Sequence, residues 1–213
     1  MLKDIHTHHL SDSFETQLLS CCYKDEGTEC INKAVFLSVG IHPWYLTAED
    51  FHLQQEWINK QVNDSRVIAI GEGGLDKLCA TPFDLQELAF RWLIDVSEAH
   101  QLPLIIHNVK STAELIRLKR EYKPSSPWII HGFRGKPQQA AEYIRHGFYL
   151  SVGERFSTEA LRQIPPNYLF LETDESLLPI SQIYERVAEC RAITLEELED
   201  SEFENINHVF YKK

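Results

Sequence analysis

The chain has 213 residues, 43% of them hydrophobic, and a formal net charge of −11, so we expect residues 1–213 to form one domain around a sizeable core. The negative charge argues against an extensive basic surface for nucleic acid, so a phosphate-bearing substrate would need a local cationic site, which bound divalent metals could supply. No apolar run reaches membrane-spanning length and no signal-peptide core opens the chain, which indicates a cytoplasmic protein without membrane contact.

The first predicted strand is a short apolar run that ends on His6-Thr7-His8. Residues i and i+2 of an extended segment point to the same side, so these two imidazoles can reach a common point, and that arrangement binds metals. His9 alternates to the opposite side and is not expected to be a ligand. Residues 10–33 are polar and irregular, with a short strand expected at 17–23, and are the least readable part of the chain.

The chain contains five cysteines, and two of them, Cys21 and Cys22, are adjacent. This usage is typical of reduced thiols and not of a disulfide framework. We expect the cysteine side chains to pack as small hydrophobes. A zinc cluster formed by Cys21, Cys22 and Cys30 is the alternative, although no paired C-x-x-C spacing supports it.

The rest of the chain alternates apolar strand runs with helical patterns. Strands are predicted at 34–39, 66–70, 103–106, 128–130, 148–152 and 169–171. Helices are predicted at 47–63, after Thr81 with Pro82 in the first helical position, and after Pro137. Another is predicted from a Ser111–Glu114 capping box to Tyr122. The pattern is helical again from Pro179 onward, with a second capping box at Thr194 and Glu197. The helix after Pro82 carries an apolar stripe of Leu85, Leu88, Ala89, Trp92, Leu93 and Val96.

This alternation predicts an α/β fold in which helices cover a parallel sheet. Seven to eight strand–helix units favour a closed (β/α) TIM-type barrel over a doubly wound sheet. We expect the barrel to be distorted or short by one unit near the N-terminus, because residues 10–33 lack a clear helical pattern.

Residues of metal-ligand type follow several of the predicted strands, and they are His6, His8, Glu72, His107, His131 and Asp174. Each has a structural alternative, since a lone histidine is usually a satisfied structural group and a carboxylate often caps the next helix. A barrel brings the carboxyl ends of its strands to one rim, where all of these side chains would converge. Buried together without a metal, they would leave several polar groups without partners.

Imidazole and carboxylate ligands suit zinc, magnesium, manganese or a similar divalent ion. Two metals bridged by a carboxylate are the natural fit for this set. Such a pair supports hydrolysis, because one metal lowers the pKa of a water, the other polarises the substrate oxygen, and both stabilise an in-line displacement.

The motifs together resemble the TatD family of metal-dependent deoxyribonucleases, within the amidohydrolase-like barrels. They are His6-Thr7-His8, Gly40-Ile41-His42-Pro43, residues 69–76, Ile106-His107, residues 131–135 and Glu172-Thr173-Asp174. The resemblance implies that His6 and His8 hold one metal, that His107 and His131 hold the other, and that Glu72 bridges them. Asp174 would bind the first metal and act as general base or acid, so Asp174 and Glu72 are the expected catalytic residues. The implied activity is phosphodiester hydrolysis on DNA, often from an end.

Three departures from the family pattern leave the metal ligands in place and affect substrate choice. The segment between His8 and Val35 is short, Glu175-Ser176 replaces a proline-containing turn, and Val109-Lys110 stands where an arginine is usual after His107. Lysine contacts a phosphate only as a point charge, whereas arginine does so with two parallel hydrogen bonds.

Substrate contacts are predicted for His42, Lys110 and Arg134, with structural or solvated roles as the alternatives. Trp44 and Phe133 could stack on bases, although packing is the favoured role for both.

The leading interpretation is a two-metal deoxyribonuclease or phosphodiesterase that acts on DNA and needs no obligate protein partner. A hydrolase of the same fold that acts on a small ester, lactone or amide is the first alternative, because a fold does not define a substrate. A non-catalytic metal-binding module is the second alternative. It would be marked by a broken ligand set, and none is broken here.

Overall fold

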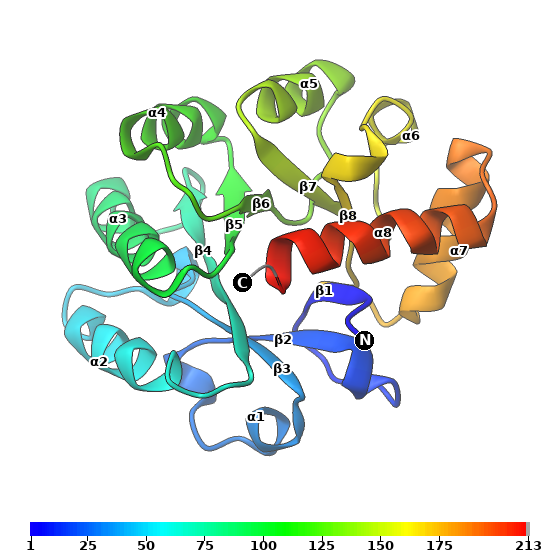
Figure 1. Cartoon of the computed structure of the whole chain (residues 1–213). Coiled ribbons are helices and arrows are strands. Elements are labelled where there is room, and N and C mark those ends of the chain that lie inside the picture. The colour runs from blue at the N-terminus through cyan, green and yellow to red at the C-terminus, as the bar shows by residue number, and fades with distance from the viewer. Residues whose placement is uncertain (212–213) are drawn as a thin grey trace.

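Eight parallel strands, paired in chain order, form the sheet of this protein (Figure 1). The computed structural model describes residues 1–211. The strands are β1 Asp4–Thr7, β2 Gln17–Cys21, β3 Phe36–Val39, β4 Val67–Asp76, β5 Leu104–Val109, β6 Trp128–Ile130, β7 Phe148–Val152 and β8 Leu169–Leu171. The predicted TIM-type barrel is confirmed. Each strand overlaps its predicted range, but β4 and β5 run beyond the predicted ends, to Asp76 and Val109, so Glu72 and His107 lie within strands.

The sheet closes where the chain after β8 meets β1. The backbone N–H of Asp174 donates to the carbonyl of His6 at 2.9 Å, and the N–H of His8 donates to the carbonyl of Asp174 at 3.1 Å. Closure brings residues from the first strand and from the end of the last strand side by side at one rim.

The expected loss of a unit near the N-terminus was wrong for its strand, because β2 is present and pairs with both neighbours. The distortion lies in the helical layer. Residues 8–16 connect β1 to β2 and contain only the 3-10 helix η1 Phe14–Thr16. A helical crossover takes about a dozen residues or more, so this connection is too short for one. The next connection contains η2 Tyr23–Asp25 and the short helix α1 Glu29–Lys33.

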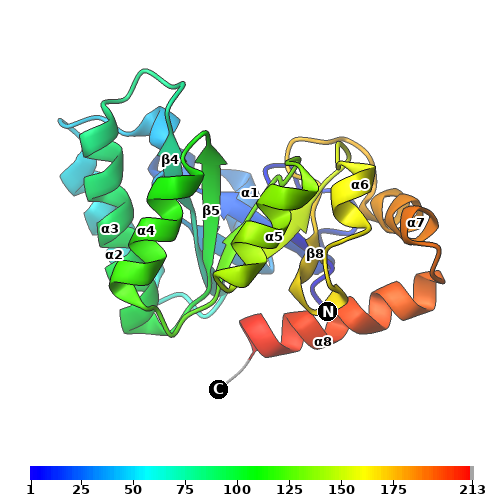
Figure 2. The ribbon, with the colours of Figure 1, turned by 90° about the horizontal axis from the view of Figure 1, so that it is seen from above.

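Longer helices cover the outside of the other strands (Figure 1). They are α2 Phe51–Gln61, α3 Phe83–His100, α4 Thr112–Tyr122, α5 Pro137–Arg145 and α7 Ile180–Arg191. Between them lie the single-turn helix α6 Thr158–Leu161 and the 3-10 turns η3 Pro43–Tyr45 and η4 Pro166–Tyr168. The last helix, α8 Leu195–Phe210, lies across the end of the barrel opposite the strand arrowheads (Figure 2). It therefore closes the floor and leaves the carboxyl rim open.

Side chains alternate between two apolar cores. Ile105 and Ile129 point into the barrel, where they join Ile206 and Phe210 from α8. Their neighbours along the strands pack outward against the helices, as Ile106 does. This alternation is the period of two expected of strands, and it leaves both faces of the sheet buried.

Helix starts differ in detail from the sequence expectation. The capping box at Thr194 and Glu197 is confirmed by reciprocal bonds of 3.1 and 2.8 Å. The capping box predicted at Ser111 was wrong. The Ser111 hydroxyl donates to the Val109 carbonyl at 3.0 Å, and Glu114 pairs with Lys77. Helix α3 begins at Phe83, so Pro82 stands one position before the helix. Leu88 is 55% exposed and falls outside the apolar stripe.

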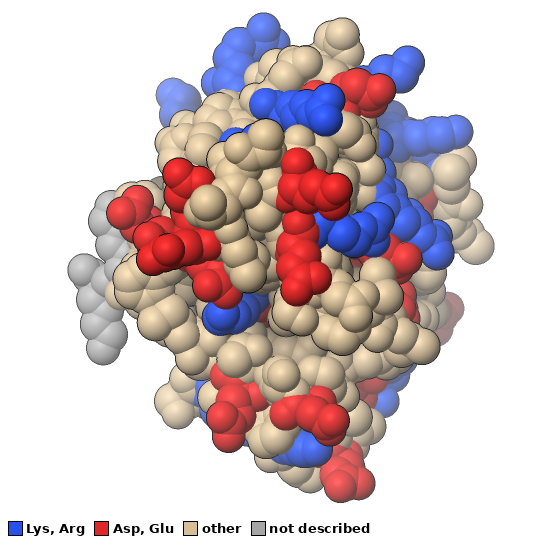
Figure 3. Space-filling model, turned by 90° about the vertical axis from the view of Figure 1, so that its right-hand side faces the viewer, with Lys and Arg blue, Asp and Glu red and all other residues tan. Residues whose placement is uncertain are grey.

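Acidic and basic side chains are interspersed on the face that Figure 3 shows, and no continuous basic surface covers the described residues there. This agrees with a chain that carries 32 acidic and 21 basic side chains. Within residues 1–211, no helix has the length and apolarity needed to cross a membrane.

Candidate metal centre

Glu72 of β4 lies at the middle of the open rim with only 4% of its surface exposed. Its Oε1 atom is 2.7 Å from Nδ1 of His107, 2.7 Å from Nε2 of His131 and 3.1 Å from Nε2 of His42. These three imidazoles come from β5 and from the loops after β6 and β3. One oxygen of the carboxylate therefore faces a complete group of histidines.

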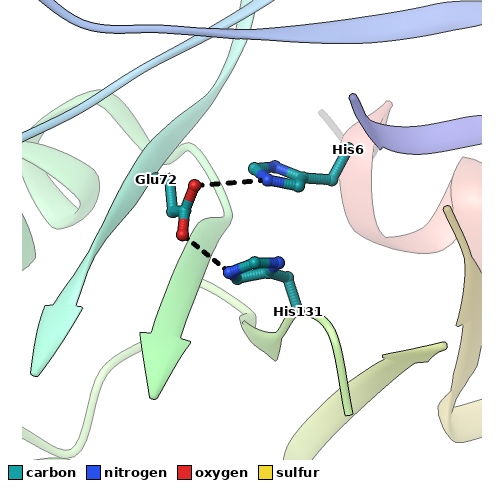
Figure 4. Close-up of side chains that lie close together, drawn as sticks. All are labelled: His6, Glu72 and His131. Carbon is teal, nitrogen blue, oxygen red and sulfur yellow. Dashed lines mark ion pairs between the residues drawn. The ribbon is translucent and has the colours of Figure 1, made fainter. Parts of the chain in front are cut away.

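The other oxygen of Glu72 faces the first strand. Oε2 lies 3.3 Å from Nε2 of His6 and 3.2 Å from Nε2 of His8. Figure 4 shows His6 and His131 approaching different oxygens of the same carboxylate. A carboxylate whose two oxygens serve separate groups of ligand atoms has the arrangement of a bridge between two ions.

Asp174 completes the group on the Oε2 side. Its Oδ1 atom lies 3.8 Å from Nε2 of His6 and 3.7 Å from Nε2 of His8, which is too far for hydrogen bonds. Ligand atoms that each lie about 2.1 Å from one ion are separated from each other by about 3–4 Å. The three side chains are therefore spaced as ligands of a shared cation.

Several buried polar atoms at this site have no hydrogen-bond partner among the described residues. They are Nδ1 and Nε2 of His6, Oε2 of Glu72 and Nδ1 of His131. Unpaired buried polar atoms cost folding free energy, and native proteins rarely retain them. Divalent cations would satisfy the atoms that face the Glu72 carboxylate, and imidazole with carboxylate is a donor set that such ions accept. The residues present therefore fit a metal centre.

Charge stabilises the central carboxylate. Burial by itself would raise the pKa of Glu72, but the surrounding histidines, His131 foremost, hold that pKa well below its usual value. Burial likewise opposes protonation of His131, yet Glu72 and Glu172 raise its pKa well above the usual value. The pKa of His42 is lowered by burial, with contributions from His107 and His131. Glu72 is therefore ionised, as a carboxylate that binds a cation must be.

Glycines allow β4 to deliver Glu72 into the centre. Gly71 has φ of 129° and Gly74 has φ of 153°, values that only glycine adopts readily. A Cβ atom at Gly74 would collide with the carbonyl of His107 on β5. The register between β4 and β5 shifts between Ile70 and Gly73, and Glu72 stands within this irregularity.

Comparison with known proteins decides the family. Residues 24–211 match the family described as TatD related DNase. The chain belongs to this family. It is 30% identical to the uncharacterized metal-dependent hydrolase YabD of Bacillus subtilis in an alignment of 201 positions that covers 83% of this chain and 77% of that protein. It is 30% identical to deoxyribonuclease Tat-D of Schizosaccharomyces pombe in an alignment of 155 positions that covers 64% of this chain and 50% of that protein.

Solved structures share the fold at low identity. The chain superposes on YjjV, the TatD homologue of Escherichia coli, with a TM-score of 0.82 over 100% of this chain and 98% of the other, at 17% identity. A TatD family hydrolase of Entamoeba histolytica matches with a TM-score of 0.79 at 19% identity, covering 99% and 98% of the two chains. The structures agree in fold, and the match of residues 24–211 to the family confirms the TatD resemblance inferred from the motifs.

The TatD-family centre includes a carboxylate that the sequence reasoning did not assign. Glu172 is fully buried, accepts a hydrogen bond from the N–H of Gly132 at 2.6 Å and lies 3.5 Å from Nδ1 of His131. Glu172 thereby orients the imidazole of His131 through the ring nitrogen that faces away from Glu72. In the sequence, the position of Glu172 two residues before Asp174 was the feature that could have indicated this role.

Asp76 has a comparable supporting role at the end of β4. One of its oxygens accepts a hydrogen bond from the Trp44 indole at 2.7 Å and lies 3.4 Å from Nε2 of His107. Asp76 therefore links the imidazole of His107 to an aromatic residue of the rim. The motif at residues 69–76 contained Asp76, but its partners follow only from the fold.

A cavity of about 580 Å³ opens above the centre. Arg134 lines it, as the prediction of a substrate contact requires, and so does Arg155, which no sequence motif indicated. His42 lines it too, but its Nε2 also approaches Glu72, which places it among the candidate ligands. Lys110 is exposed and is absent from the lining residues, so a substrate contact from it has no support in the structure.

The two aromatic residues suggested for base stacking differ in their exposure to solvent. Trp44 is 58% exposed at the rim, whereas Phe133 is 5% exposed and belongs to the outer core. Only Trp44 therefore presents a surface to a ligand.

The cysteines of the TatD-family protein stand apart from the metal centre. None belongs to a described group of three potential ligands. The Cys22 thiol donates to Asp25 at 3.2 Å, and burial raises its pKa to about 12. The alternative of a zinc cluster at these cysteines therefore gains no support, and Cys21 packs in the outer core as expected.

Proposed function

We propose that this protein is a metal-dependent phosphodiesterase that cleaves DNA. In this proposal His6, His8 and Asp174 hold one divalent ion, and His107 and His131 hold a second. The observation that carries the proposal is the orientation of Glu72, whose two oxygens each face one of the two histidine groups. Family membership and the name of the S. pombe relative support DNA as the substrate.

Metals at such a pair of sites would activate a water and stabilise the charge that develops on the phosphate. The Asp174 side chain is 25% exposed and lines the main cavity. Its backbone is held by two hydrogen bonds to β1, so its carboxylate stays beside His6 and His8. Asp174 is therefore placed to accept a proton from the attacking water and return it to the leaving oxygen.

Arginines on the cavity wall supply the recognition of phosphate. Arg134 and Arg155 both line the cavity, on the loops that follow β6 and β7. A guanidinium matches the geometry of a phosphate with two parallel hydrogen bonds. These side chains replace the missing arginine after β5, and they bring positive charge to the site of an otherwise acidic chain.

A hydrolase of small esters, lactones or amides is the competing function. Glu154 and Glu175 line the same cavity as the arginines, so its net charge does not by itself select an anionic substrate. A neutral ester would require only the metal centre and the proton transfer by Asp174. We regard this activity as the alternative that the experiment must separate.

The deciding experiment compares three substrates after removal and controlled return of Mg²⁺, Mn²⁺ or Zn²⁺. They are a labelled single-stranded oligonucleotide, bis(p-nitrophenyl) phosphate and p-nitrophenyl acetate. We expect metal-dependent cleavage of the first two, and its loss in Glu72→Gln. Glu185→Gln, on the exposed side of α7, controls for contaminating nuclease. Cleavage of the acetate alone would replace the nuclease proposal with the esterase alternative.

A further inference from the structure

A second cavity reaches the metal centre from the other side of the rim. Its volume is about 310 Å³, and its lining includes Cys22, Lys24 and Tyr45, from the loops after β2 and β3. The main cavity is lined instead by residues that follow β5 to β8, such as Arg134 and Arg155. The rim is therefore hollowed on both sides of the candidate centre.

The two cavities meet at the centre itself. Five residues line both of them, and they are His8, His42, Trp44, Glu72 and Glu175. Three of these belong to the groups of candidate ligands. The candidate metal centre thus lies in the middle of a path across the rim and not at its end.

The short connections near the N-terminus border the second cavity. No α-helix follows β1, and only the short helix α1 follows β2. The cavity is lined by Thr28, Cys30 and Ile31, which belong to α1 and to the turn before it. The departure from the family pattern that the sequence shows between His8 and Val35 therefore coincides with the second opening.

The chemistry of the second cavity suits a single nucleic-acid strand. Tyr45 is 43% exposed and Trp44 is 58% exposed, and aromatic surfaces of this kind stack on bases without regard to sequence. The ammonium of Lys24 lies 3.3 Å from the centre of the Tyr45 ring, so a cation accompanies the aromatic surface. Asp76 holds the Trp44 indole in place through its 2.7 Å hydrogen bond.

The two acidic groups of this cavity that lie outside the groups of candidate ligands have partners. Asp25 accepts hydrogen bonds from the N–H and the thiol of Cys22. Glu175 lies 3.0 Å from Nε2 of His9. Lys24 forms no ion pair with a carboxylate among the described residues, so its charge is available to a phosphate of the strand.

We propose, on the basis of the nuclease function proposed above, that single-stranded DNA lies across the metal centre with one segment in each cavity. The main cavity holds the side bound by Arg134 and Arg155, and the second cavity holds the other side against Lys24, Tyr45 and Trp44. A strand bound in this way needs no free end. The protein therefore cleaves internal phosphodiester bonds.

The first test compares a closed circle of single-stranded DNA with a linear strand of the same length and sequence. We expect metal-dependent conversion of the circle to a full-length linear product at a rate comparable to that of the linear strand. Stepwise shortening of the linear strand while the circle stays intact would overturn this inference and leave the nuclease function standing. If neither substrate is cut, the proposed function fails, and this inference fails with it.

The second test measures binding without turnover, in an Asp174→Asn background with Mn²⁺ present. The readout is the anisotropy of labelled single-stranded DNA as a function of salt. Loss of one lysine–phosphate contact lowers the slope of log affinity against log salt by about 0.7. We expect Lys24→Ala to show this change. An unchanged slope in Lys24→Ala would remove the second cavity from the binding path.

Lys33→Ala is the matched control for this measurement. Lys33 is exposed and also lies over an aromatic ring, with its ammonium 4.8 Å from the centre of Phe14, but it does not line either cavity. Its substitution should leave the salt slope unchanged. In the active background, Lys33→Ala should likewise leave cleavage of the circular strand and of bis(p-nitrophenyl) phosphate unchanged.

Discussion

The backbone of Asp174 donates to the carbonyl of His6, and the side chain of Asp174 faces the imidazole of the same residue. One residue thus closes the barrel and supplies a candidate metal ligand. The 2.9 Å backbone bond joins the loop after β8 to β1 and places the two side chains together at the rim. The backbone hydrogen bonds that close the barrel therefore also assemble this half of the centre.

This relationship predicts that Asp174→Asn separates activity from folding. Asparagine keeps the backbone bonds and tolerates the positive φ of 55° at this position. Its amide cannot accept the proton of the attacking water, so we expect kcat on single-stranded DNA to fall by about 100-fold or more. Thermal unfolding of the metal-free variant should match that of the parent. Retained turnover would show that Asp174 is not the proton acceptor.

Glu72→Gln tests the bridge between the two proposed metal sites. The amide removes the negative charge that five imidazoles surround, and only one of its two terminal atoms can bind a cation. We expect metal analysis after divalent loading to give two equivalents for the parent protein and one or fewer for the variant. Two equivalents in Glu72→Gln would contradict the bridging role. One equivalent in the parent would indicate a mononuclear hydrolase.

Chelation should lower thermal stability if the buried imidazoles are satisfied by metal. A ligand present at about 100 times its dissociation constant stabilises the folded state by about 2.7 kcal/mol. For a protein of this size that corresponds to a loss of about 5–10 °C in Tm when EDTA is added. His6→Asn should abolish much of the difference, because both ring nitrogens of His6 lack other partners. An EDTA effect of equal size in the variant would place the stabilising metal elsewhere.

Glu202 of α8 should make stability fall as the pH rises. Burial raises the pKa of this carboxyl well above 4.5, and the charge of Asp4 adds to the shift, while the hydrogen bond from Leu171 opposes it. An acid with a raised pKa in the folded state binds its proton more tightly there, so its contribution is complete below pH 4.5 and is lost as the pH rises through the folded pKa. Asp4, with a pKa raised to about 6 mainly by burial, acts in the same direction.

Glu202→Gln therefore should be more stable than the parent at pH 8, with a difference that shrinks towards pH 4.5. Glutamine retains the oxygen that accepts the Leu171 N–H. The measurement is denaturant unfolding at several pH values between 4.5 and 8. Glu204→Gln, exposed on the same helix, is the control and should follow the parent curve. Parallel curves for the parent and Glu202→Gln would show that the carboxyl is solvated.

Sequence patterns were sufficient for the barrel and for the rim positions of the candidate ligands. An apolar run that ends on a polar residue is a local feature of the sequence. At Ile105–His107 this run forms part of β5, with the polar residue towards the carboxyl end of the strand. The short first connection was also readable. Its consequence was misjudged, because β2 pairs with β1 and β3 without needing a helix of its own.

The amino-acid sequence by itself determined the order of strands and helices, the family, and which side chains stand at strand ends, since each of these depends on neighbours along the chain. The tertiary structure alone decided that His42 approaches Glu72, that Glu172 supports His131 and that Lys110 stays outside the cavity. It also decided that a second cavity meets the centre. These are distances between strands, and they are set by closure of the sheet and by the register shift at β4, which no local pattern encodes.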